Sequence, residues 1–224
     1  MSNSVVGAII GFSLAVVPAA LLAKNDSPEI SPDGLELVEK DRRGEIYADP
    51  GVDWSVYDQI QLDTATVAFR KNWQRDQNRP PQSFKVNTKD MERIKADMSE
   101  LFDQVFTEEL TGKGDYTLAT GSGENVMRIK PQIVDLDVYA PDTRNAGMTH
   151  SYTDSAGKMT LKLEIYDSVT GDLIATASDR REAPRRGYVQ WTTSVSNRAE
   201  ARRMLQRWAK DLHKRLDEAR TSSN

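Results

Sequence analysis

The 224-residue sequence contains no cysteine and only two histidines, His150 and His213. The lack of cysteine excludes disulfides, thiolate metal sites, cysteine nucleophiles and lipid anchors attached through a thioether. The shortage of histidine disfavours a metal site built from two or three imidazoles, although a calcium site made of carboxylates stays open. We therefore expect no cofactor and no metal.

A large excess of either charge is also missing. The 30 Lys and Arg residues and 34 Asp and Glu residues leave a net charge of -4, and the hydrophobic set makes up 38%. This balance is typical of a globular protein, and the length suits one domain with a sizeable core. A slightly acidic chain has no overall attraction for nucleic acid, so we expect no nucleic-acid partner.

Charged side chains are absent before Lys24, and residues 5–23 are apolar apart from Ser13. An apolar run so close to the start is typical of a signal peptide, which predicts export to the periplasm or cell envelope. An uncleaved membrane anchor at 1–23 is the alternative, because about 20 apolar residues can span a bilayer. Residues 24–34 are rich in Pro, Ser and charge, which predicts a flexible tether.

The remaining residues predict a single α+β domain over 35–219, followed by a disordered tail at 220–224. Apolar and polar residues alternate along several segments, which is typical of strands with one buried face. A turn between the last two segments indicates a hairpin. The predicted strands are 57–69, 116–119, 125–139, 159–166 and 173–178. Residues 70–86 form a polar segment that contains Pro80 and Pro81, so we expect a long loop there.

Two longer segments have the apolar spacing of amphipathic helices. Asn87 and Asp90 are placed to cap the first helix, which ends near Gly112. The second helix is expected over 197–219, with Asn197 and Glu200 as a capping box. Its polar face carries Arg202, Arg203, Lys210 and Asp211. Two apolar helix faces need one sheet face to cover, which predicts a two-layer sandwich with an antiparallel or mixed sheet of four to five strands.

Residues 45–57 (EIYADPGVDWSVY) and the turn at Asp167, Gly171 and Leu173 resemble the family called domain of unknown function 3313. Its members are mostly bacterial envelope lipoproteins, and the similarity covers about residues 35–216. The resemblance implies no reaction, substrate or cofactor. Leu21-Leu22-Ala23 is similar to a lipobox, but Lys24 stands where a lipoprotein has cysteine. We therefore do not expect lipid anchoring through cysteine.

Two polar loops combine basic and aromatic residues: the first is the loop at 70–86, and the second lies between the strand at 173–178 and the last helix. Such a mixture can hold phosphate groups through ion pairs and stacking. If the loops lie at the same end of the sheet, they form one cationic patch for a partner protein or an anionic lipid or polysaccharide. The alternative is solvated loops whose two tryptophans pack against the core. The cations outside the main candidates are Arg70, Lys71, Arg79, Arg180 and Arg181. The main candidates for partner contact are Trp73, Arg75, Arg185, Arg186, Tyr188 and Trp191.

The sequence thus favours a non-catalytic binding or assembly module of the cell envelope. On this hypothesis, Arg185→Glu with Arg186→Glu weakens partner capture without changing the Tm. A periplasmic hydrolase that uses His150 and nearby carboxylates is one alternative, although a catalytic triad draws its groups from separate segments. A structural spacer is another. Asp135 and Asp137 alternate on one predicted strand, so they are expected to face the same side, either as paired carboxylates or as solvated ones.

Overall fold

The computed structural model describes residues 29–80, 85–112, 116–138, 151–153, 157–183, 190–192 and 194–223. For residues 151–153, 190–192 and 194–197 it describes the backbone alone. The described part of the chain forms an α+β fold with a mixed sheet of eight strands and three α-helices. The predicted fold class is confirmed, but four to five strands and two helices were too few.

The elements have well-defined bounds along the chain. The strands are β1 Glu36–Lys40, β2 Gly44–Ala48, β3 Gln59–Leu62, β4 Thr66–Phe69, β5 Thr117–Leu118, β6 Val126–Val138, β7 Ser151–Thr153, β8 Gly157–Asp167, β9 Leu173–Glu182 and β10 Gln190–Thr192. The helices are α1 Trp73–Gln77, α2 Thr88–Gly112 and α3 Ser194–Ser222, and a 3₁₀ turn, η1, covers Trp54–Val56.

The eight-stranded sheet has the order β1-β2-β9-β8-β6-β3-β5, and β4 also pairs with β6. Neighbouring strands are antiparallel along the part β1-β2-β9-β8-β6 of the sheet. Strand β3 is parallel to its neighbours β5 and β6, and β4 is parallel to β6. The predicted hairpin is confirmed as β8 and β9. A separate small sheet pairs β7 with β10.

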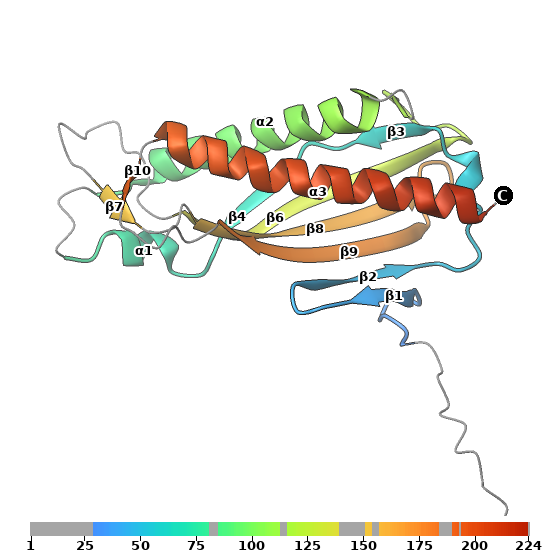
Figure 1. Cartoon of the computed structure of the whole chain (residues 1–224), viewed down its shortest axis with the longest axis horizontal. Coiled ribbons are helices and arrows are strands. Elements are labelled where there is room, and N and C mark those ends of the chain that lie inside the picture. Colours follow the sequence, from blue (N-terminus) through green and yellow to red (C-terminus); the bar gives the residue numbers. More distant parts are fainter. Residues whose placement is uncertain are drawn as a thin grey trace, which may run out of the picture.

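Helices α2 and α3 cover the same face of the sheet and pack against each other, as the apolar spacing predicts (Figure 1). Phe102, Phe106 and Leu205 are fully buried and pack in one core with Ile129 and Ile133 of β6. Burial of apolar surface contributes roughly 25 cal/mol per Å², so this layer is the main source of stability. The opposite sheet face carries the alternate, polar residues of the same strands.

The predicted strand over 57–69 is two strands, β3 and β4, which pair one after the other with β6. The break lies opposite Pro131, which has no N–H to donate across the sheet. The carbonyl of Ile129 accepts from the N–H of Asp63 at 3.0 Å. Because the backbone groups of residues two positions apart point toward the same neighbouring strand, the backbone of Pro131 also points toward β3 and β4. Between the strands, the carbonyl of Ala65 instead accepts from the Ser99 hydroxyl of α2 at 2.8 Å.

Both predicted helices form, and the first has the predicted cap. The Asn87 side chain accepts from the N–H of Asp90 at 3.0 Å, and the Asp90 carboxylate accepts from the N–H of Asn87 at 3.1 Å. The second prediction is wrong at the start, because α3 begins at Ser194 and Asn197 lies inside its first turn. Helix α3 also continues to Ser222, so residues 220–222 are helical rather than a disordered tail.

The predicted long loop at 70–86 contains the short helix α1, which is a correction. Helix α1 ends at Gln77, before the prolines, so Pro80 does not interrupt it. Residues 29–34, which fall in the expected tether, make a turn against β1. The N–H of Leu37 donates to the carbonyl of Glu29 at 2.8 Å, and Ile30 forms a β-bridge with Glu36.

The predicted leader at 1–23 and residues 24–28 lie outside the described residues. Within the described ranges, none of the helices has a stretch that is both long and apolar enough to cross a membrane.

Candidate functional site

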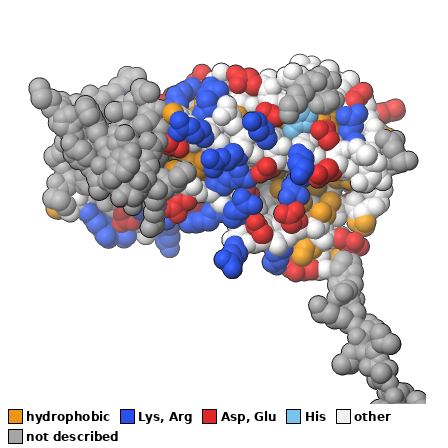
Figure 2. Space-filling view, viewed as in Figure 1, with side chains coloured by type: hydrophobic (Ala, Val, Ile, Leu, Met, Phe, Trp, Pro, Cys, Tyr) orange, Lys and Arg blue, Asp and Glu red, His pale blue; other side chains and the backbone are white. Residues whose placement is uncertain are grey.

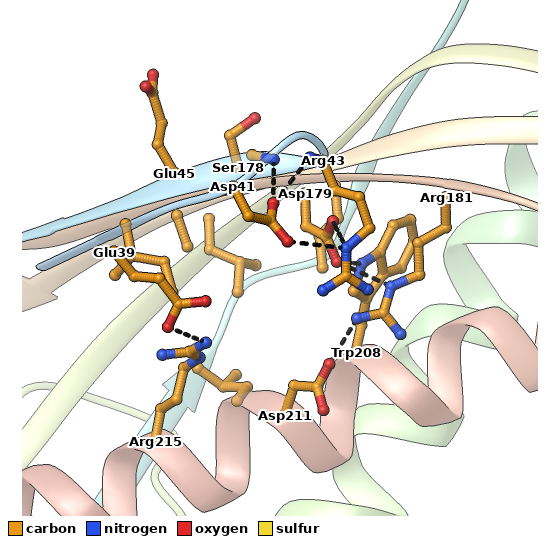
Figure 3. A pocket seen from close by; sticks show the side chains of 16 residues that line it. Glu39, Asp41, Arg43, Glu45, Ser178, Asp179, Arg181, Trp208, Asp211 and Arg215 are labelled. Atoms are coloured by element: carbon orange, nitrogen blue, oxygen red, sulfur yellow. Dashed lines mark hydrogen bonds and ion pairs between the residues drawn. The ribbon is translucent and has the colours of Figure 1, made fainter.

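A cleft of about 90 Å³ lies between the β1–β2 hairpin, β9 and α3 (Figure 3). We call it the hairpin cleft. Its apolar lining comes from the sheet and from α3, and its rim is charged. The apolar residues are Ile46, Leu161, Leu163, Ala177, Trp208 and Leu212.

The hairpin cleft exists because β2 lies close to β9 and because the turn between β1 and β2 is tight. A Cβ on Gly44 would lie 1.6 Å from the carbonyl oxygen of Ser178, so only glycine allows this pairing. In the turn before it, the Asp41 carboxylate accepts from the N–H groups of Arg43 at 2.7 Å and Gly44 at 3.0 Å. These two bonds, that from Arg43 above all, lower the pKa of Asp41.

Asp179 is the centre of the charged rim. Its Oδ2 accepts from Nε of Arg181 at 2.8 Å and from the indole N–H of Trp208 at 2.9 Å. Arg181 also pairs with Asp211 at 2.5 Å, and its guanidinium lies 5.5 Å from the centre of the Trp208 ring. On the other wall, Arg215 pairs with Glu39 at 2.7 Å.

The cations of the hairpin cleft are therefore already neutralised by carboxylates of the same cleft, as the dashed lines in Figure 3 show. Arg43, the remaining cation, pairs with Asp41 at 3.1 Å. Such a network holds the hairpin on α3 and leaves little free charge for a ligand. The main role of these ion pairs is to join the edge of the sheet to helix α3.

Free positive charge lies instead on the outer face of α3. Figure 2 shows Lys and Arg side chains gathered along this helix. Four exposed cations at spacings of four, three and four residues fall on one helix face. We call this set, Arg203, Arg207, Lys210 and Lys214, the α3 basic stripe.

The two ends of the α3 basic stripe are paired and its middle is not. Arg203 pairs with Glu200 at 2.5 Å, and Lys214 lies 3.5 Å from Glu218. Within the part of the chain that the structure describes, Arg207 and Lys210 have no ion pair. The sequence prediction named Arg203 and Lys210 only as part of a polar face, although the 203, 207, 210, 214 spacing was visible in it.

The first predicted loop does not offer the expected aromatic contact, which is a correction for Trp73. Trp73 is 1% exposed, stacks on Phe69 with ring centres 4.1 Å apart, and donates its indole N–H to the carbonyl of Val138 at 3.2 Å. Burial of the indole agrees with the alternative that this tryptophan packs against the core. Arg75 is exposed, but it pairs with Asp76 at 3.1 Å.

The second predicted loop lies largely outside the described residues. This holds for Arg185, Arg186 and Tyr188, and for Trp191 only the backbone, in β10, is described. The expected joint patch of the two loops therefore stays a prediction. Arg181, from the same cluster, is in the hairpin cleft, and its side chain is only 9% exposed.

Asp135 and Asp137 do not face the same side, contrary to the prediction. A bulge between Val134 and Asp137 breaks the alternation, and Asp135 has a positive φ of 52°. Asp135 is exposed, whereas Asp137 is 3% exposed. Asp137 pairs with Nε of Arg70 at 2.8 Å and lies 3.8 Å from Nζ of Lys158.

Asp137 also lines a second hollow, of about 180 Å³, where α2 and α3 begin. We call it the helix-end cavity. Its wall is mostly apolar, with three methionines among the side chains, and three cations lie around it. The lining includes Ile94, Met98, Leu101, Leu136, Met159, Ala201 and Met204, with Arg93, Lys158 and Arg198 as the cations.

The model of the family described as "Protein of unknown function (DUF3313)" matches residues 25–212. The chain belongs to this family. The resemblance carried by residues 45–57 and the β8–β9 turn is thereby confirmed. The DUF3313 chain has no match among curated proteins.

The solved structures that match this DUF3313 chain share little sequence with it. A Xanthomonas campestris protein is 12% identical, with 79% of this chain and 93% of that chain covered and a TM-score of 0.44. A putative neuraminyllactose-binding hemagglutinin homolog from Helicobacter pylori is 10% identical, with 75% and 87% covered and a TM-score of 0.42. A minor lipoprotein from Acinetobacter baumannii is 14% identical, with 74% and 96% covered and a TM-score of 0.29.

Of the two histidines, only His213 lies in the described part of this DUF3313 chain. His150 lies outside the described residues, so the hydrolase alternative stays untested. His213 is 2% exposed and packs edge-on against Tyr116. Among the described residues, no three Asp, Glu or His side chains are grouped so that they could hold a metal ion.

Proposed function

We propose that this DUF3313 protein is a non-catalytic binding module of the bacterial cell envelope, which binds an anionic membrane surface through the α3 basic stripe. The supporting observation is the pair of exposed cations, Arg207 and Lys210, that lacks acidic partners within the described ranges. Three cations close to the stripe in α3 and β9 are instead paired: Arg181 with Asp211, Arg202 with Glu108 and Arg215 with Glu39. An unpaired cation has its full charge available for a phosphate group.

The geometry of the α3 basic stripe suits a flat, repeating anionic surface. From Arg203 to Lys214 the helix rises about 1.5 Å per residue, so the cations extend along about 16 Å of the helix. Near an anionic membrane each Lys or Arg contributes about 1 kcal/mol. The net charge of -4 does not oppose this, because charges on the far side of the protein lie beyond the Debye length of about 8 Å.

The export predicted from residues 1–23 provides the setting for this proposal, because it would place the chain beside a membrane. A retained anchor and the basic stripe would then act together, since two weak membrane contacts on one chain reinforce each other. A cleaved leader would leave the basic stripe as the main contact.

The test compares binding to vesicles of phosphatidylglycerol and of phosphatidylcholine. The protein is recovered from its native cell fraction, and its mass shows whether the leader is present. Substituting Arg207→Gln with Lys210→Gln removes about 2 kcal/mol, so the preference for the anionic vesicle should fall roughly 30-fold. Binding through an apolar leader is similar on both vesicles and cancels in the ratio.

The matched control is Lys89→Gln with Lys162→Gln, which makes the same change in net charge. Lys89 is exposed at the start of α2, and Lys162 is exposed on β8. We expect this control to retain the preference for phosphatidylglycerol. An equal loss in both variants would contradict the proposal, because it would show that net charge and not the basic stripe determines binding. No preference in the unmodified protein would contradict it too, and would favour a partner protein.

A further inference from the structure

Helix α1 and the residues beside it carry more positive charge than the neighbouring carboxylates balance. Residues 70–79 contain four cations and a single carboxylate, Asp76. We call the four cations, Arg70, Lys71, Arg75 and Arg79, the α1 basic cluster. The region therefore differs from the hairpin cleft, where each cation has a carboxylate of its own.

Asp76 is shared by three guanidinium groups. Its Oδ2 lies 2.7 Å from Nη1 of Arg70. Its Oδ1 lies 3.1 Å from Nη2 of Arg75 and 3.6 Å from Nη2 of Arg79. These arginines, above all Arg70 through its hydrogen bond, lower the pKa of Asp76, so this carboxylate stays ionised at neutral pH. One negative charge thus faces three positive ones.

The other charged groups nearby leave a surplus of positive charge. Asp137 of β6 pairs with Arg70 at 2.8 Å, but it also lies 3.8 Å from Lys158. Glu182 is the neighbour of Lys158 across β8 and β9. Asp135 faces the opposite side from Asp137 and has no ion pair within the described ranges. The α1 basic cluster and Lys158 therefore stand against three carboxylates, a surplus of two positive charges.

Arg75 and Arg79 present this surplus to the solvent. Their side chains are 60% and 63% exposed, and both contact the same oxygen of Asp76. Two guanidinium groups that share one oxygen are close enough for a single phosphate group to bridge them. Each guanidinium has five N–H donors, so donors remain after the contact with Asp76.

Three side chains hold α1 in a fixed place on the rest of the fold. The indole N–H of the buried Trp73 donates to the carbonyl of Val138 at 3.2 Å. The side-chain amides of Gln74 and Asn78 donate to the carbonyl of Val86 at 3.1 and 2.9 Å. Helix α1 is therefore a firm support for the two exposed arginines.

A phosphate monoester matches this surplus in charge and in geometry. It carries about 1.5 to 2 negative charges at neutral pH and has three strong acceptor oxygens. Guanidinium groups bind such oxygens through pairs of parallel hydrogen bonds. A phosphodiester or a carboxylate has only one charge, so it would leave half of the surplus unbalanced.

We propose that Arg75 and Arg79 of the α1 basic cluster form a binding site for a phosphate monoester, carried either by a soluble compound or by a lipid. The site uses none of the cations of the α3 basic stripe, and it selects a dianion rather than an anionic surface.

The test follows the arginine Nε–H signals of the ¹⁵N-labelled protein by NMR, with the protein as it is recovered from its native cell fraction. Methyl phosphate is the monoester probe, and dimethyl phosphate is the diester probe. At a pH of about 7.5 we expect methyl phosphate to shift the signals of Arg75 and Arg79. It should bind at least about fivefold more tightly than dimethyl phosphate, because it carries an additional charge. At a pH of about 5 methyl phosphate loses that charge, so the two probes should bind equally.

Arg75→Gln with Arg79→Gln tests the location. Both side chains are exposed, so we expect the Tm to stay unchanged while the preference for methyl phosphate is lost. Arg42→Gln with Lys162→Gln is the matched control, since it removes the same charge from exposed positions in the β1–β2 turn and on β8. The control should keep the preference.

Vesicles of phosphatidylcholine that contain phosphatidic acid identify the source of the phosphate. Weaker vesicle binding by the Arg75→Gln and Arg79→Gln variant than by the control would assign the site to a lipid, whereas a loss with methyl phosphate alone would assign it to a soluble compound. Equal affinity for the two phosphate esters at the higher pH, or an equal loss in the control, would overturn the proposal. Shifts confined to arginines of α3 would overturn it too. None of these results depends on the preference of the α3 basic stripe for phosphatidylglycerol.

Discussion

Tyr57 and Asp167 join two segments that are distant in sequence. The Tyr57 hydroxyl donates to Oδ2 of Asp167 at 2.8 Å, just before β3. Oδ1 of Asp167 accepts from the N–H groups of Val169 at 2.9 Å and Thr170 at 2.8 Å. The bond from Thr170 is the largest cause that lowers the pKa of Asp167, and burial raises the pKa of Tyr57 well above its usual value.

Replacing Tyr57 with Phe should lower the free energy of unfolding by about 1.5–3 kcal/mol at neutral pH, because a bond to a charged acceptor is lost. It should also raise the pKa of Asp167. Since the pKa of Asp167 is lowered in the folded state, its contribution is present above the unfolded pKa of about 4 and lost as pH falls. The pKa of Tyr57 is raised, so its contribution is lost as pH rises above about 10.

Urea titrations should therefore show that the unmodified protein and Tyr57→Phe differ less in their free energy of unfolding at low and at high pH than at neutral pH. Tyr166→Phe is the control, because the hydroxyl of Tyr166 donates to Glu164 at 2.8 Å on the partly exposed sheet face. Burial raises the pKa of Tyr166 to about 12. A loss as large in this control, or a difference for Tyr57 that does not change with pH, would contradict the assignment.

At the scale of elements, the edge hairpin depends on one backbone approach. Strands β1 and β2 extend the sheet beyond β9 (Figure 1). Helix α3 contacts this hairpin through the pair of Arg215 and Glu39 (Figure 3). The approach of Gly44 to the carbonyl of Ser178 lets β2 pair with β9. The hairpin should therefore open separately from the core when this approach is blocked.

Gly44→Ala should detach the β1–β2 hairpin, because the new methyl group would overlap the backbone of β9. We expect amide hydrogens of residues 36–48 to exchange at least about tenfold faster, while those of β6 and β8 stay protected, which hydrogen exchange with mass spectrometry can measure. Gly121→Ala is the control, since a Cβ at that position would have no other atom within 4 Å among the described residues. Unchanged exchange at 36–48 would show that the hairpin is held by α3 alone.

For the molecule as a whole, opposite charges are unevenly distributed. The chain has a net charge of -4, yet residues 198–220 contain eight Lys and Arg residues against four Asp and Glu residues. This excess lies on the helix layer, while the other sheet face is polar and mixed, with Arg128 paired to Asp63 at 2.8 Å. The two faces should therefore differ in their affinity for anions.

Membrane binding through the helix layer should decrease steeply with salt. Raising the salt concentration from about 0.1 to 1 M shortens the Debye length from about 10 to 3 Å, so the preference for phosphatidylglycerol should disappear. The Arg207→Gln and Lys210→Gln variant should show a shallower salt dependence in the same vesicle assay. A preference that persists at high salt would indicate apolar insertion rather than ion pairing.

The sequence by itself determined the parts of the fold that depend on short-range patterns. The Asn87–Asp90 cap, the apolar faces of α2 and α3 and the β8–β9 hairpin all follow from residues within a few positions of one another. The family resemblance at residues 45–57 was also visible in it. The spacing of the α3 basic stripe was present as well, but nothing local showed which of its cations lack partners.

Only the tertiary structure decided the features that depend on distant partners. Pro131 separates β3 from β4 because it lies opposite the gap between them, and Trp73 is buried because Phe69 and the end of β6 receive it. The bulge before Asp137 reversed the side that alternation predicted. Periodicity describes how a chain segment repeats, whereas pairing, burial and free charge depend on the segments that pack against it.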